Sequence, residues 1–286
     1  MTVHQPFSYS LGPLEITGFG LAVLLSFVIA QIISQRELER RGHDSSYMGD
    51  LVFAAVVGGL VGAKIYYVIL TRDASAFFSR GGFVFWGGLM GGIISVLAII
   101  RWKKLSVMRV ADVTGISMGA AYAVGRTGCW AVGDDYGRPW NSLLAVSFPD
   151  GAPPSTALNM KEQFGVAIPA GVAPNDVLSV YPTQLLEVAL GLVMFAVLWR
   201  LRDHKHAEGW LFGLYMVLAG VERFVVEFLR AKDDRFFGVL TAAQLLAVIF
   251  TIAGVVWMVK TRESGIGSRG SRVGSRESGV GSRGTA

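Results

Sequence analysis

Residues 51–70 read LVFAAVVGGLVGAKIYYVIL, a run of twenty residues in which Lys64 is the single charged side chain. An α-helix needs about twenty mostly apolar residues to cross the hydrocarbon of a bilayer, because each residue adds ~1.5 Å. This run is therefore typical of a transmembrane helix. Gly58 and Gly62 lie four residues apart in it, a spacing that favours close packing against a neighbouring helix.

Six further apolar runs have a similar length. They cover residues 14–33, 83–100, 110–132, 181–201, 209–229 and 239–259. The third run along the chain is the shortest and the fourth is the most polar. The sequence therefore predicts an all-α integral membrane domain of about seven transmembrane helices over residues 1–260.

The composition agrees with a membrane protein. Hydrophobic residues make up 52% of the chain and charged residues 16%, whereas a soluble domain carries about 25% charged residues. The net charge is +5, but the basic residues are too scattered to form a nucleic-acid-binding face. Cys129 is the single cysteine, so an internal disulfide and a multi-cysteine metal site are both excluded.

The distribution of Lys and Arg between the runs predicts the orientation. Sixteen of them lie on the side that holds the loops after the first, third and fifth runs and the C-terminal tail, and seven lie on the other side. Cytoplasmic loops carry the excess of positive charge. We therefore expect the N-terminus outside and the C-terminus in the cytoplasm.

Two segments lie outside the predicted helices. The segment 133–180 would be an extracytoplasmic loop, and its Pro, Ala and Gly content predicts little regular structure. The tail 261–286 repeats Gly, Ser and Arg and has almost no apolar residues. Such a tail cannot offset the entropy cost of ordering, so we expect it to be disordered.

Three basic residues remain inside the predicted spans, namely Lys64, Arg126 and Arg223. Each costs roughly 2.5–3.5 kcal/mol at the bilayer centre, so such residues face the interior of the bundle and find partners there. For Lys64, a functional role and a structural ion pair are both open. Glu227 and Arg230 follow Arg223 by four and seven residues, which places all three on one helical face. We interpret this face as an anion site of net positive charge, the alternative being a cluster of charges at a helix end.

The end of the fourth run is the densest polar patch, reading GRTGCWAVGDDYGRP over residues 125–139. Asp134 and Asp135 are candidate bases or orienting groups, whereas a lone helical cysteine such as Cys129 is more often a packing residue than a nucleophile. Gln184 and Glu187 share a face of the fifth run, and residues 81–88 read GGFVFWGG. In the predicted topology all these patches lie in the outer half of the membrane, which indicates one shared site. All four histidines lie outside the spans, so a carboxylate would have to act as general base unless the substrate ionises unaided.

Three motifs carry a resemblance to a known family. Residues 125–129 (GRTGC), 133–134 and 137–138 are similar to the Gly-Arg-x-Gly-Asn, Gly-Glu and Gly-Arg signature of the phosphatidylglycerol–prolipoprotein diacylglyceryl transferases of bacterial inner membranes. Residues 181–187 (YPTQLLE) resemble that family's His-Pro-Ser-Gln-Leu-Tyr-Glu, and residues 222–230 (ERFVVEFLR) resemble Phe-Arg-x-x-x-Glu-Phe-x-Arg. The resemblance covers residues 11–260 and agrees with seven helices and an external N-terminus.

The chain departs from the family at four polar positions. Phe19 and Trp86 replace the family's tyrosine and histidine, Cys129 replaces its signature asparagine, and Asp134 replaces a glutamate. The anion-binding half of the family site is thus better retained than the half that handles protons.

The resemblance implies transfer of a diacylglyceryl group from phosphatidylglycerol to the lipobox cysteine thiol of a prolipoprotein signal peptide, with glycerol phosphate leaving. Arg126 and Arg223 would stabilise the phosphate, Glu227 would orient Arg223, and Asp134 or Glu187 would assist the thiol. No metal or cofactor is implied, and the partners are the two substrates and the lipid bilayer, not nucleic acid. The substrate-binding residues would be Arg126, Gly137, Arg138, Arg230, Gln184, Trp86, Phe19 and Lys64.

Two other functional interpretations remain open. A lipid-binding paralogue without catalysis would agree with the replaced tyrosine, histidine and asparagine. A small-solute transporter ranks below both, because the two halves of the chain show no convincing repeat.

Overall fold

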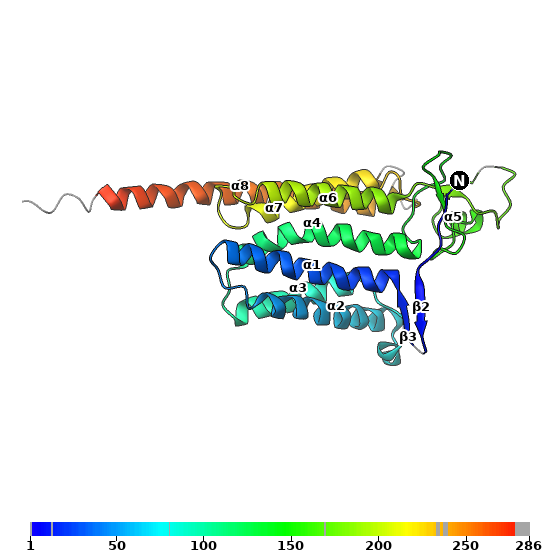
Figure 1. Cartoon of the computed structure of the whole chain (residues 1–286), viewed down its shortest axis with the longest axis horizontal. Helices are drawn as coiled ribbons and strands as arrows, with labels where there is room; N and C mark the ends of the chain where they lie inside the picture. The colour runs from blue at the N-terminus through cyan, green and yellow to red at the C-terminus, as the bar shows by residue number, and fades with distance from the viewer. Residues whose placement is uncertain are drawn as a thin grey trace, which may run out of the picture. The chain divides into compact units, whose positions relative to one another are not determined.

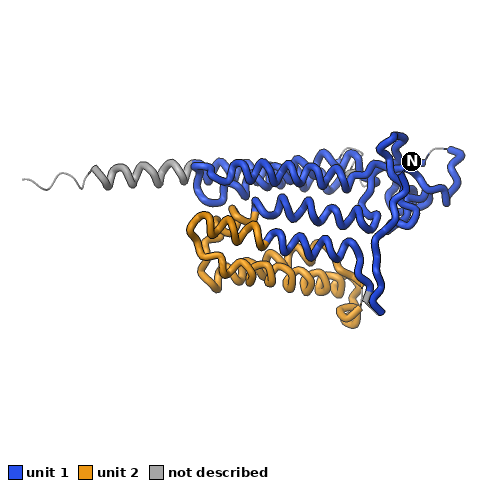
Figure 2. The backbone as a smooth tube through the Cα atoms, in the orientation of Figure 1, with its two compact units in different colours: residues 1–30, 115–286 blue, residues 31–114 orange. Residues whose placement is uncertain are grey.

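The structure is a computed structural model that describes residues 2–12, 14–79, 81–168, 170–232, 235–236 and 240–277. The backbone forms two compact units, shown in Figure 2. Unit 1 contains residues 1–30 and 115–286, and unit 2 contains residues 31–114.

Helices form most of the described chain. The long ones are α1 (Gly18–Arg40), α2 (Met48–Thr71), α3 (Phe85–Trp102), α4 (Val107–Val132), α6 (Thr183–Arg200), α7 (Trp210–Val226) and α8 (Ala242–Glu277). The short ones are the 3-10 helix η1 (Ala74–Phe78) and α5 (Ala157–Glu162). Each long helix corresponds to one of the seven apolar runs of the sequence.

Within the described residues, five helical segments are long and apolar enough to cross a membrane, as in an integral membrane protein. They lie in α1, α2, α3, α6 and the part Ala242–Arg262 of α8. Of the other two long helices, α7 has 17 residues, and α4 carries Arg109, Asp112 and Arg126. The charge of α4 and the length of α7 distinguish them from the other five, and together with α6 they carry the polar motifs.

Close approach between helices of unit 1 depends on glycines of α4 and α7. A Cβ atom added to Gly128 of α4 would lie 2.7 Å from Cβ of Ala22 in α1, and one added to Gly119 would lie 3.0 Å from the backbone of Phe195 in α6. At Gly220 of α7 it would lie 2.7 Å from the carbonyl oxygen of Ala247 in α8. The helices α4, α6, α7 and α8 of unit 1 accordingly run side by side (Figure 1).

In unit 2, α2 and α3 pack through facing glycines. A Cβ atom at Gly58 would lie 2.6 Å from the carbonyl oxygen of Gly91, and one at Gly62 would lie 2.4 Å from that of Gly87. The prediction that Gly58 and Gly62 serve helix packing is therefore confirmed. Apolar residues of the α1–α2 and α3–α4 ends form a buried cluster in this unit, including Leu38, Met48 and Val113.

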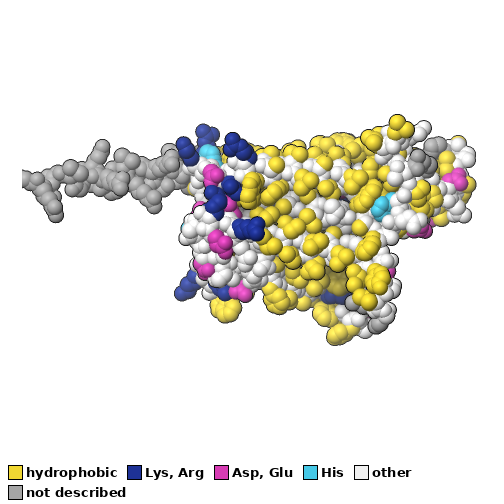
Figure 3. Space-filling view, viewed as in Figure 1, with side chains coloured by type: hydrophobic (Ala, Val, Ile, Leu, Met, Phe, Trp, Pro, Cys, Tyr) yellow, Lys and Arg dark blue, Asp and Glu magenta, His cyan; other side chains and the backbone are white. Residues whose placement is uncertain are grey.

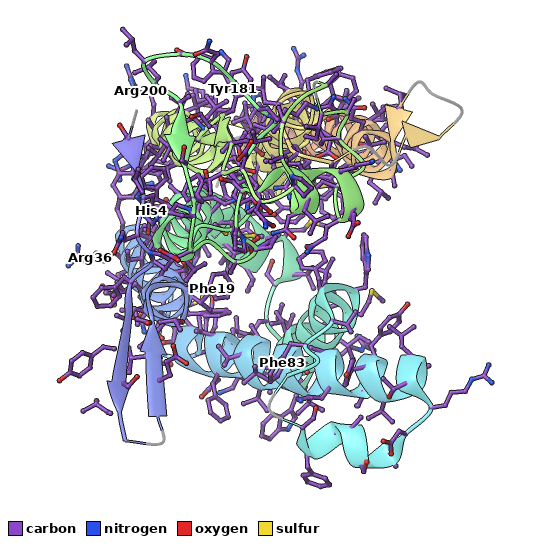
Figure 4. The ribbon with its side chains drawn as sticks, turned by 90° about the vertical axis from the view of Figure 1, so that its right-hand side faces the viewer. His4, Phe19, Arg36, Phe83, Tyr181 and Arg200 are labelled. Atoms are coloured by element: carbon purple, nitrogen blue, oxygen red, sulfur yellow. The ribbon has the colours of Figure 1, made fainter. Side chains whose placement is uncertain are left out.

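The segment 133–180 contains short elements around a core of its own. Strand β4 (Val146–Ser147) pairs in parallel with β1 (Thr2–Val3) and antiparallel with β5 (Ser179–Val180). Phe148, Met160 and Val180 are fully buried there. This core ties the N-terminus to the segment at one end of unit 1, and Figure 4, which views that end, labels His4 and Tyr181.

Two hairpins and the tail complete the described chain. Strands β2 (Ser8–Leu11) and β3 (Leu14–Thr17) pair antiparallel, as do β6 (Arg235–Phe236) and β7 (Leu240–Thr241). Where the sequence predicts a disordered tail from Thr261, α8 continues as helical backbone to Glu277, despite the low helix propensity of Gly and Ser. The remainder of that tail, residues 278–286, lies outside the described residues.

Hydrophobic side chains cover most of the molecular face in Figure 3, while Lys and Arg side chains gather near one end. On the helices many large hydrophobic side chains are exposed, such as Phe53 at 70% and Ile94 at 60%. Burial of exposed apolar surface of this extent requires lipid or another apolar environment. The surface thus agrees with the membrane class that the run lengths predict.

Candidate active site

Arg126 of α4 lies at the centre of a polar cluster in unit 1. Its Nη1 donates to Oδ2 of Asp135 at 2.7 Å and its Nη2 donates to Oε1 of Glu187 at 2.5 Å. Its Nη1 also lies 3.4 Å from Sγ of Cys129 one turn further along the helix. The side chain is 14% exposed, so this guanidinium is neutralised by two carboxylates from other segments.

Asp135 joins the end of α4 to the segment after α7. Its Oδ2 accepts from Arg126, and its Oδ1 accepts from Nη2 of Arg230. Burial alone would raise the pKa of Asp135, but the charges and hydrogen bonds of Arg230 and Arg126 lower it to about 2. Asp135 is therefore an ionised bridge between two arginines.

The N-terminus of α6 fixes the backbone of this bridge. Asp135 has a positive φ of 59°, a conformation that needs support in a residue with a side chain. The hydroxyl of Thr183 donates to the carbonyl oxygen of Asp135 at 2.7 Å, and Nε2 of Gln184 donates to that of Asp134 at 2.7 Å. The predicted binding residue Gln184 thus holds the Asp134–Asp135 turn in place, while its own Oε1 has no hydrogen-bond partner in the part of the chain that the structure describes.

Glu187 of α6 is fully buried, and its hydrogen-bond donors are two side chains of α4. Besides Arg126, the hydroxyl of Tyr122 donates to its Oε1 at 3.3 Å, and Nη1 of Arg230 lies 3.8 Å from the same oxygen. Its other oxygen, Oε2, is buried without a hydrogen-bond partner in the described structure. This is the acceptor in the cluster that is open to a further donor.

Arg223 and Glu227 form the ion pair that the sequence predicts. Nη2 of Arg223 donates to Oε2 of Glu227 at 2.5 Å, while Oε1 of Glu227 accepts from the hydroxyl of Thr241 at 3.1 Å. Arg223 is 29% exposed, about twice as much as Arg126 or Arg230. Its Nη1 lies 3.9 Å from Glu187, so Arg223 keeps donors that no carboxylate of the described chain occupies.

The prediction that Arg223, Glu227 and Arg230 share one helical face is wrong. Helix α7 ends at Val226, Glu227 is its C-cap, and Arg230 lies in an extended bridge with Gly137. The helix ends because the chain turns to pair with the segment after α4. The side chains nevertheless converge, with Nε of Arg230 3.7 Å from Oε2 of Glu227.

Gly137 and Arg138 support Arg230 from the other side of this bridge. A Cβ atom at Gly137 would lie 2.5 Å from the carbonyl oxygen of Leu229, so only glycine lets the two backbones approach this closely. Nε of Arg138 donates to the carbonyl oxygen of Arg230 at 3.1 Å. Gly137 and Arg138, which the sequence predicts as substrate-binding residues, thus contact the backbone of residues 229–230 in the structure.

Asp134 lies beside the cluster without a salt bridge to it. Its Oδ1 accepts from the backbone N–H of Asp135 at 2.7 Å. Burial raises the pKa of Asp134, and the charge of Asp135 raises it further. Of the two predicted bases, Asp134 thus accepts a hydrogen bond within its own turn, whereas Oε2 of Glu187 has no hydrogen-bond donor among the described residues.

The predicted net positive charge is wrong. We define the arginine–carboxylate cluster by its six members, Arg126, Arg223, Arg230, Asp135, Glu187 and Glu227. Three arginines face three carboxylates, because Asp135 and Glu187 join the motif of α7 from other segments. A fourth carboxylate, Glu222, adjoins the cluster: it accepts from the hydroxyl of Tyr122 at 2.9 Å.

Sequence reasoning missed Tyr122 and Glu222, and it named Asp135 as a candidate base or orienting group without including it among the site residues. Tyr122 lies four residues before Arg126 on α4, a spacing that places both on one face. Glu222 is an acidic residue inside the apolar run 209–229, whereas the charged residues considered within the spans were the basic residues Lys64, Arg126 and Arg223. Both signals were present in the sequence.

The remaining predicted residues do not join the cluster. Phe19 lies at the start of α1 and is 44% exposed; Figure 4 labels it. Lys64 and Trp86 belong to unit 2, where Trp86 is 50% exposed. Lys64 is buried, and its Nζ donates to the carbonyl oxygens of Ser79 and Gly81 and lies 4.5 Å from the ring centre of Phe83. The lysine has backbone partners, not the ion pair considered from the sequence.

The fold and this cluster define a class: a multi-pass helical membrane protein with a buried set of arginines and carboxylates at the end of its helices. Residues 6–260 match the family model described as prolipoprotein diacylglyceryl transferase, and the chain belongs to that family.

Individual relatives agree with the family model. The chain is 30% identical to the phosphatidylglycerol–prolipoprotein diacylglyceryl transferase of Xanthomonas oryzae pv. oryzae over 91% of this chain and 92% of the relative. It is 29% identical to the enzyme of that name from Bordetella bronchiseptica, over 87% and 92%. It is 26% identical to the enzyme of that name from Clostridium tetani, over 88% of this chain and 95% of the relative. The resemblance noted in the three sequence motifs is thus confirmed over nearly the whole chain.

Proposed function

We propose that this protein transfers a diacylglyceryl group from phosphatidylglycerol to the lipobox cysteine thiol of a prolipoprotein, releasing glycerol phosphate. The family and the names of the relatives support the reaction. The observation in the structure that supports it best is the convergence of three partly buried arginines around the buried Glu187, which joins all three motifs in one place.

The reaction is a displacement at the glyceryl carbon. The thiol sulfur forms the new bond to carbon, the bond from carbon to the phosphate oxygen breaks, and the thiol proton must be accepted by a base. Negative charge develops on the leaving phosphate, so positioned guanidinium donors lower the barrier. A metal is not needed for this charge, because arginines already supply paired donors.

Arg223 is the best-placed phosphate ligand of the three. One of its terminal nitrogens pairs with Glu227, while the rest of its fork has no hydrogen bond in the described chain. Thr241 and Glu227 hold the paired edge, so the open edge has a fixed direction. Arg126 is engaged by Asp135 and Glu187, and it would add charge to the phosphate from a more buried position.

Glu187 is the carboxylate that we assign to the thiol. Its Oε2 is buried and free, as an acceptor for the thiol proton must be, while Arg126 and Tyr122 hold Oε1. Asp134 is the second candidate; its engagement with the N–H of Asp135 makes it the weaker one.

We further propose seven transmembrane helices, with α4 and α7 added to the five apolar ones, in a bacterial inner membrane. The N-terminus lies outside, the C-terminus lies in the cytoplasm, and the cluster faces the outer leaflet. The excess of Lys and Arg after the first, third, fifth and seventh helices supports this orientation. Reporters fused after Lys260 and inserted near Ala152 should respond from opposite sides of the membrane; both on one side would refute it.

Release of glycerol phosphate tests the reaction. The purified protein should release it from phosphatidylglycerol vesicles when a lipobox peptide is present, and a peptide with serine in place of the acceptor cysteine is the control. No release under conditions that support another family member would refute the transferase. Retained phosphatidylglycerol binding in that case would identify a lipid-binding paralogue.

A further inference from the structure

The hydroxyl of Tyr122 lies between two carboxylates at the inner edge of the cluster. It is 2.9 Å from Oε1 of Glu222 and 3.3 Å from Oε1 of Glu187, and it accepts from Nε of Arg126 at 3.3 Å. A hydroxyl has one proton to donate and two lone pairs to accept with. Tyr122 can therefore take a proton from one carboxylate while it gives its own to the other.

Glu222 differs from the other carboxylates in its surroundings. Asp135, Glu187 and Glu227 each lie within salt-bridge distance of an arginine. Glu222 is 8% exposed, and among the described residues it forms no salt bridge; its one hydrogen bond is with Tyr122. A carboxylate without a guanidinium partner is the member of the group best suited to hold a proton.

Glu187 has the complementary arrangement. Its Oε2 is free for the incoming thiol, and its Oε1 faces Tyr122 and the arginines. A proton left on Glu187 would neutralise the carboxylate and so weaken its ion pair with Arg126. Removal of that proton restores the ion pair. The three groups thus form a chain of contacts from Glu187 through Tyr122 to Glu222, and the open oxygen of Glu187 lies at one end of it.

We propose that Tyr122 and Glu222 form a proton relay for the transfer reaction. The proposal rests on the proposed function. As the bond from sulfur to carbon forms and the bond from carbon to the phosphate oxygen breaks, the thiol proton moves to Glu187. The proton of the Tyr122 hydroxyl moves to Glu222, and Tyr122 recovers a proton from Glu187 once the protonated carboxyl group of Glu187 has turned to bring that proton to the side of Tyr122. Glu222 then returns the proton to the departing phosphate or to water, so no other reactant is consumed.

The sequence differs from the family motifs at four positions that bear on this relay. The chain has Phe19, Trp86 and Cys129 where the family motif has tyrosine, histidine and asparagine, and it has Glu222 where the motif of α7 has phenylalanine. Three polar side chains of the family motifs are thus replaced, and an ionisable side chain, Glu222, is added at a fourth position. The relay assigns Glu222 the proton-handling part that these replacements leave open.

Glu222→Gln and Tyr122→Phe test the relay. Glutamine keeps an oxygen that can accept from Tyr122 but cannot take its proton, so a structural role for Glu222 survives this change. The matched controls are Glu162→Gln on the exposed side of α5 and Tyr66→Phe on α2, which lie outside the cluster. Thermal unfolding in detergent should show that all four variants are folded.

Transfer to a lipobox peptide is measured as kcat and KM from pH 6 to 9.5. Since positioned acid–base groups contribute about 10²–10⁴ in rate, kcat at pH 6.5 should fall about 100-fold in both relay variants with KM unchanged. The deficit should shrink as pH rises past ~8.5, where a thiol ionises without help. The charged and titratable groups facing the pair are Arg126, Glu187, Arg223, Arg230 and Tyr215.

A selenocysteine peptide gives a second readout, because a selenol is ionised at neutral pH and needs no base. The relay predicts near-normal kcat with this peptide in Glu222→Gln. An equal deficit with thiol and selenol, or at all pH values, would overturn the relay, as would a variant with full activity. Inactivity of the unaltered protein with both peptides would refute the proposed function, so the two failures are distinguishable.

Discussion

Two regions of this protein bury basic side chains, and they do so in different ways. In unit 1, Arg126, Arg223 and Arg230 form ion pairs with carboxylates, and among the described residues Oε2 of Glu187 has no hydrogen-bond partner. In unit 2, Lys64 meets two backbone carbonyl oxygens, the hydroxyl of Ser79 and an aromatic ring.

The difference separates a reactive arrangement from a structural one. A lysine has three N–H donors, and those of Lys64 have three oxygen acceptors within 3.3 Å. Because all three N–H groups of Lys64 have acceptors, none is available for a hydrogen bond to a substrate. We therefore interpret Lys64 as a clamp on the segment between η1 and α3, and we assign the chemistry to the arginine–carboxylate cluster.

The largest effect should come from Arg126. We expect Arg126→Ala to lower kcat about 1000-fold, in the range for loss of a donor to developing charge, because Asp135 and Glu187 both lose their hydrogen bond to Arg126 as well. Arg126→Lys should recover little, since lysine lacks the planar fork. The assay is glycerol phosphate release, and a near-normal rate in the alanine variant would remove Arg126 from the site.

Asp135→Asn should affect stability and reveal its pH dependence. The folded pKa of Asp135 is about 2 against an ordinary 3.8, so its ionised form stabilises the fold. The contribution is present above the unfolded pKa and is lost as pH falls through the folded value; a shift of nearly two pKa units corresponds to roughly 2.5 kcal/mol.

Unfolding of wild type and Asp135→Asn in detergent at pH 7 and near pH 2 checks this sign. The variant should be less stable at pH 7, and the gap should close in acid as Asp135 of the wild type becomes protonated. A gap of equal size at both pH values would show that Asp135 does not bridge the arginines as a carboxylate.

Thr241→Val should have a moderate effect on the same cluster. It removes the hydrogen bond to Oε1 of Glu227 and so loosens the carboxylate that directs Arg223. A net hydrogen bond is worth ~1 kcal/mol, which corresponds to about a fivefold loss of kcat. Thr71→Val, at the exposed end of α2, is the control and should leave kcat unchanged. Equal rates in the two variants would mean that Thr241 does not position Glu227.

Lys64→Met should have the smallest effect on activity. The change leaves the carbonyl oxygens of Ser79 and Gly81 without their donor, which costs about 1–3 kcal/mol of stability. The kcat of the folded variant should stay within about threefold of wild type. If kcat collapsed while the melting temperature was unchanged, Lys64 would belong to the reaction and the comparison between the regions would fail.

Much of the site could be predicted from helical spacing, because spacing fixes which side chains share a face. Arg223 and Glu227 pair across one turn as expected, and Gln184 and Glu187 both reach the end of α4 from α6. Spacing fails where a helix ends, which is why Arg230 reaches the cluster through its bridge with Gly137.

Other features depended on tertiary contacts that no local pattern contains. The neutralisation of the arginines requires Asp135 to adopt a positive φ under the hydroxyl of Thr183, which follows it by 48 residues. The contact of Tyr122 with Glu222 spans 100 residues. Composition likewise showed the Pro, Ala and Gly content of 133–180 but not the buried Phe148 and Met160 around which the segment folds.

The most direct test of the central claim is the mass of a lipobox peptide incubated with phosphatidylglycerol vesicles and the purified protein. We predict that wild type adds one diacylglyceryl group to the cysteine, and that Arg126→Ala and Arg223→Ala, both folded, add none in the same time. An unmodified peptide with wild type would contradict the transferase. Full modification by both variants would show that the reaction takes place without the arginine–carboxylate cluster.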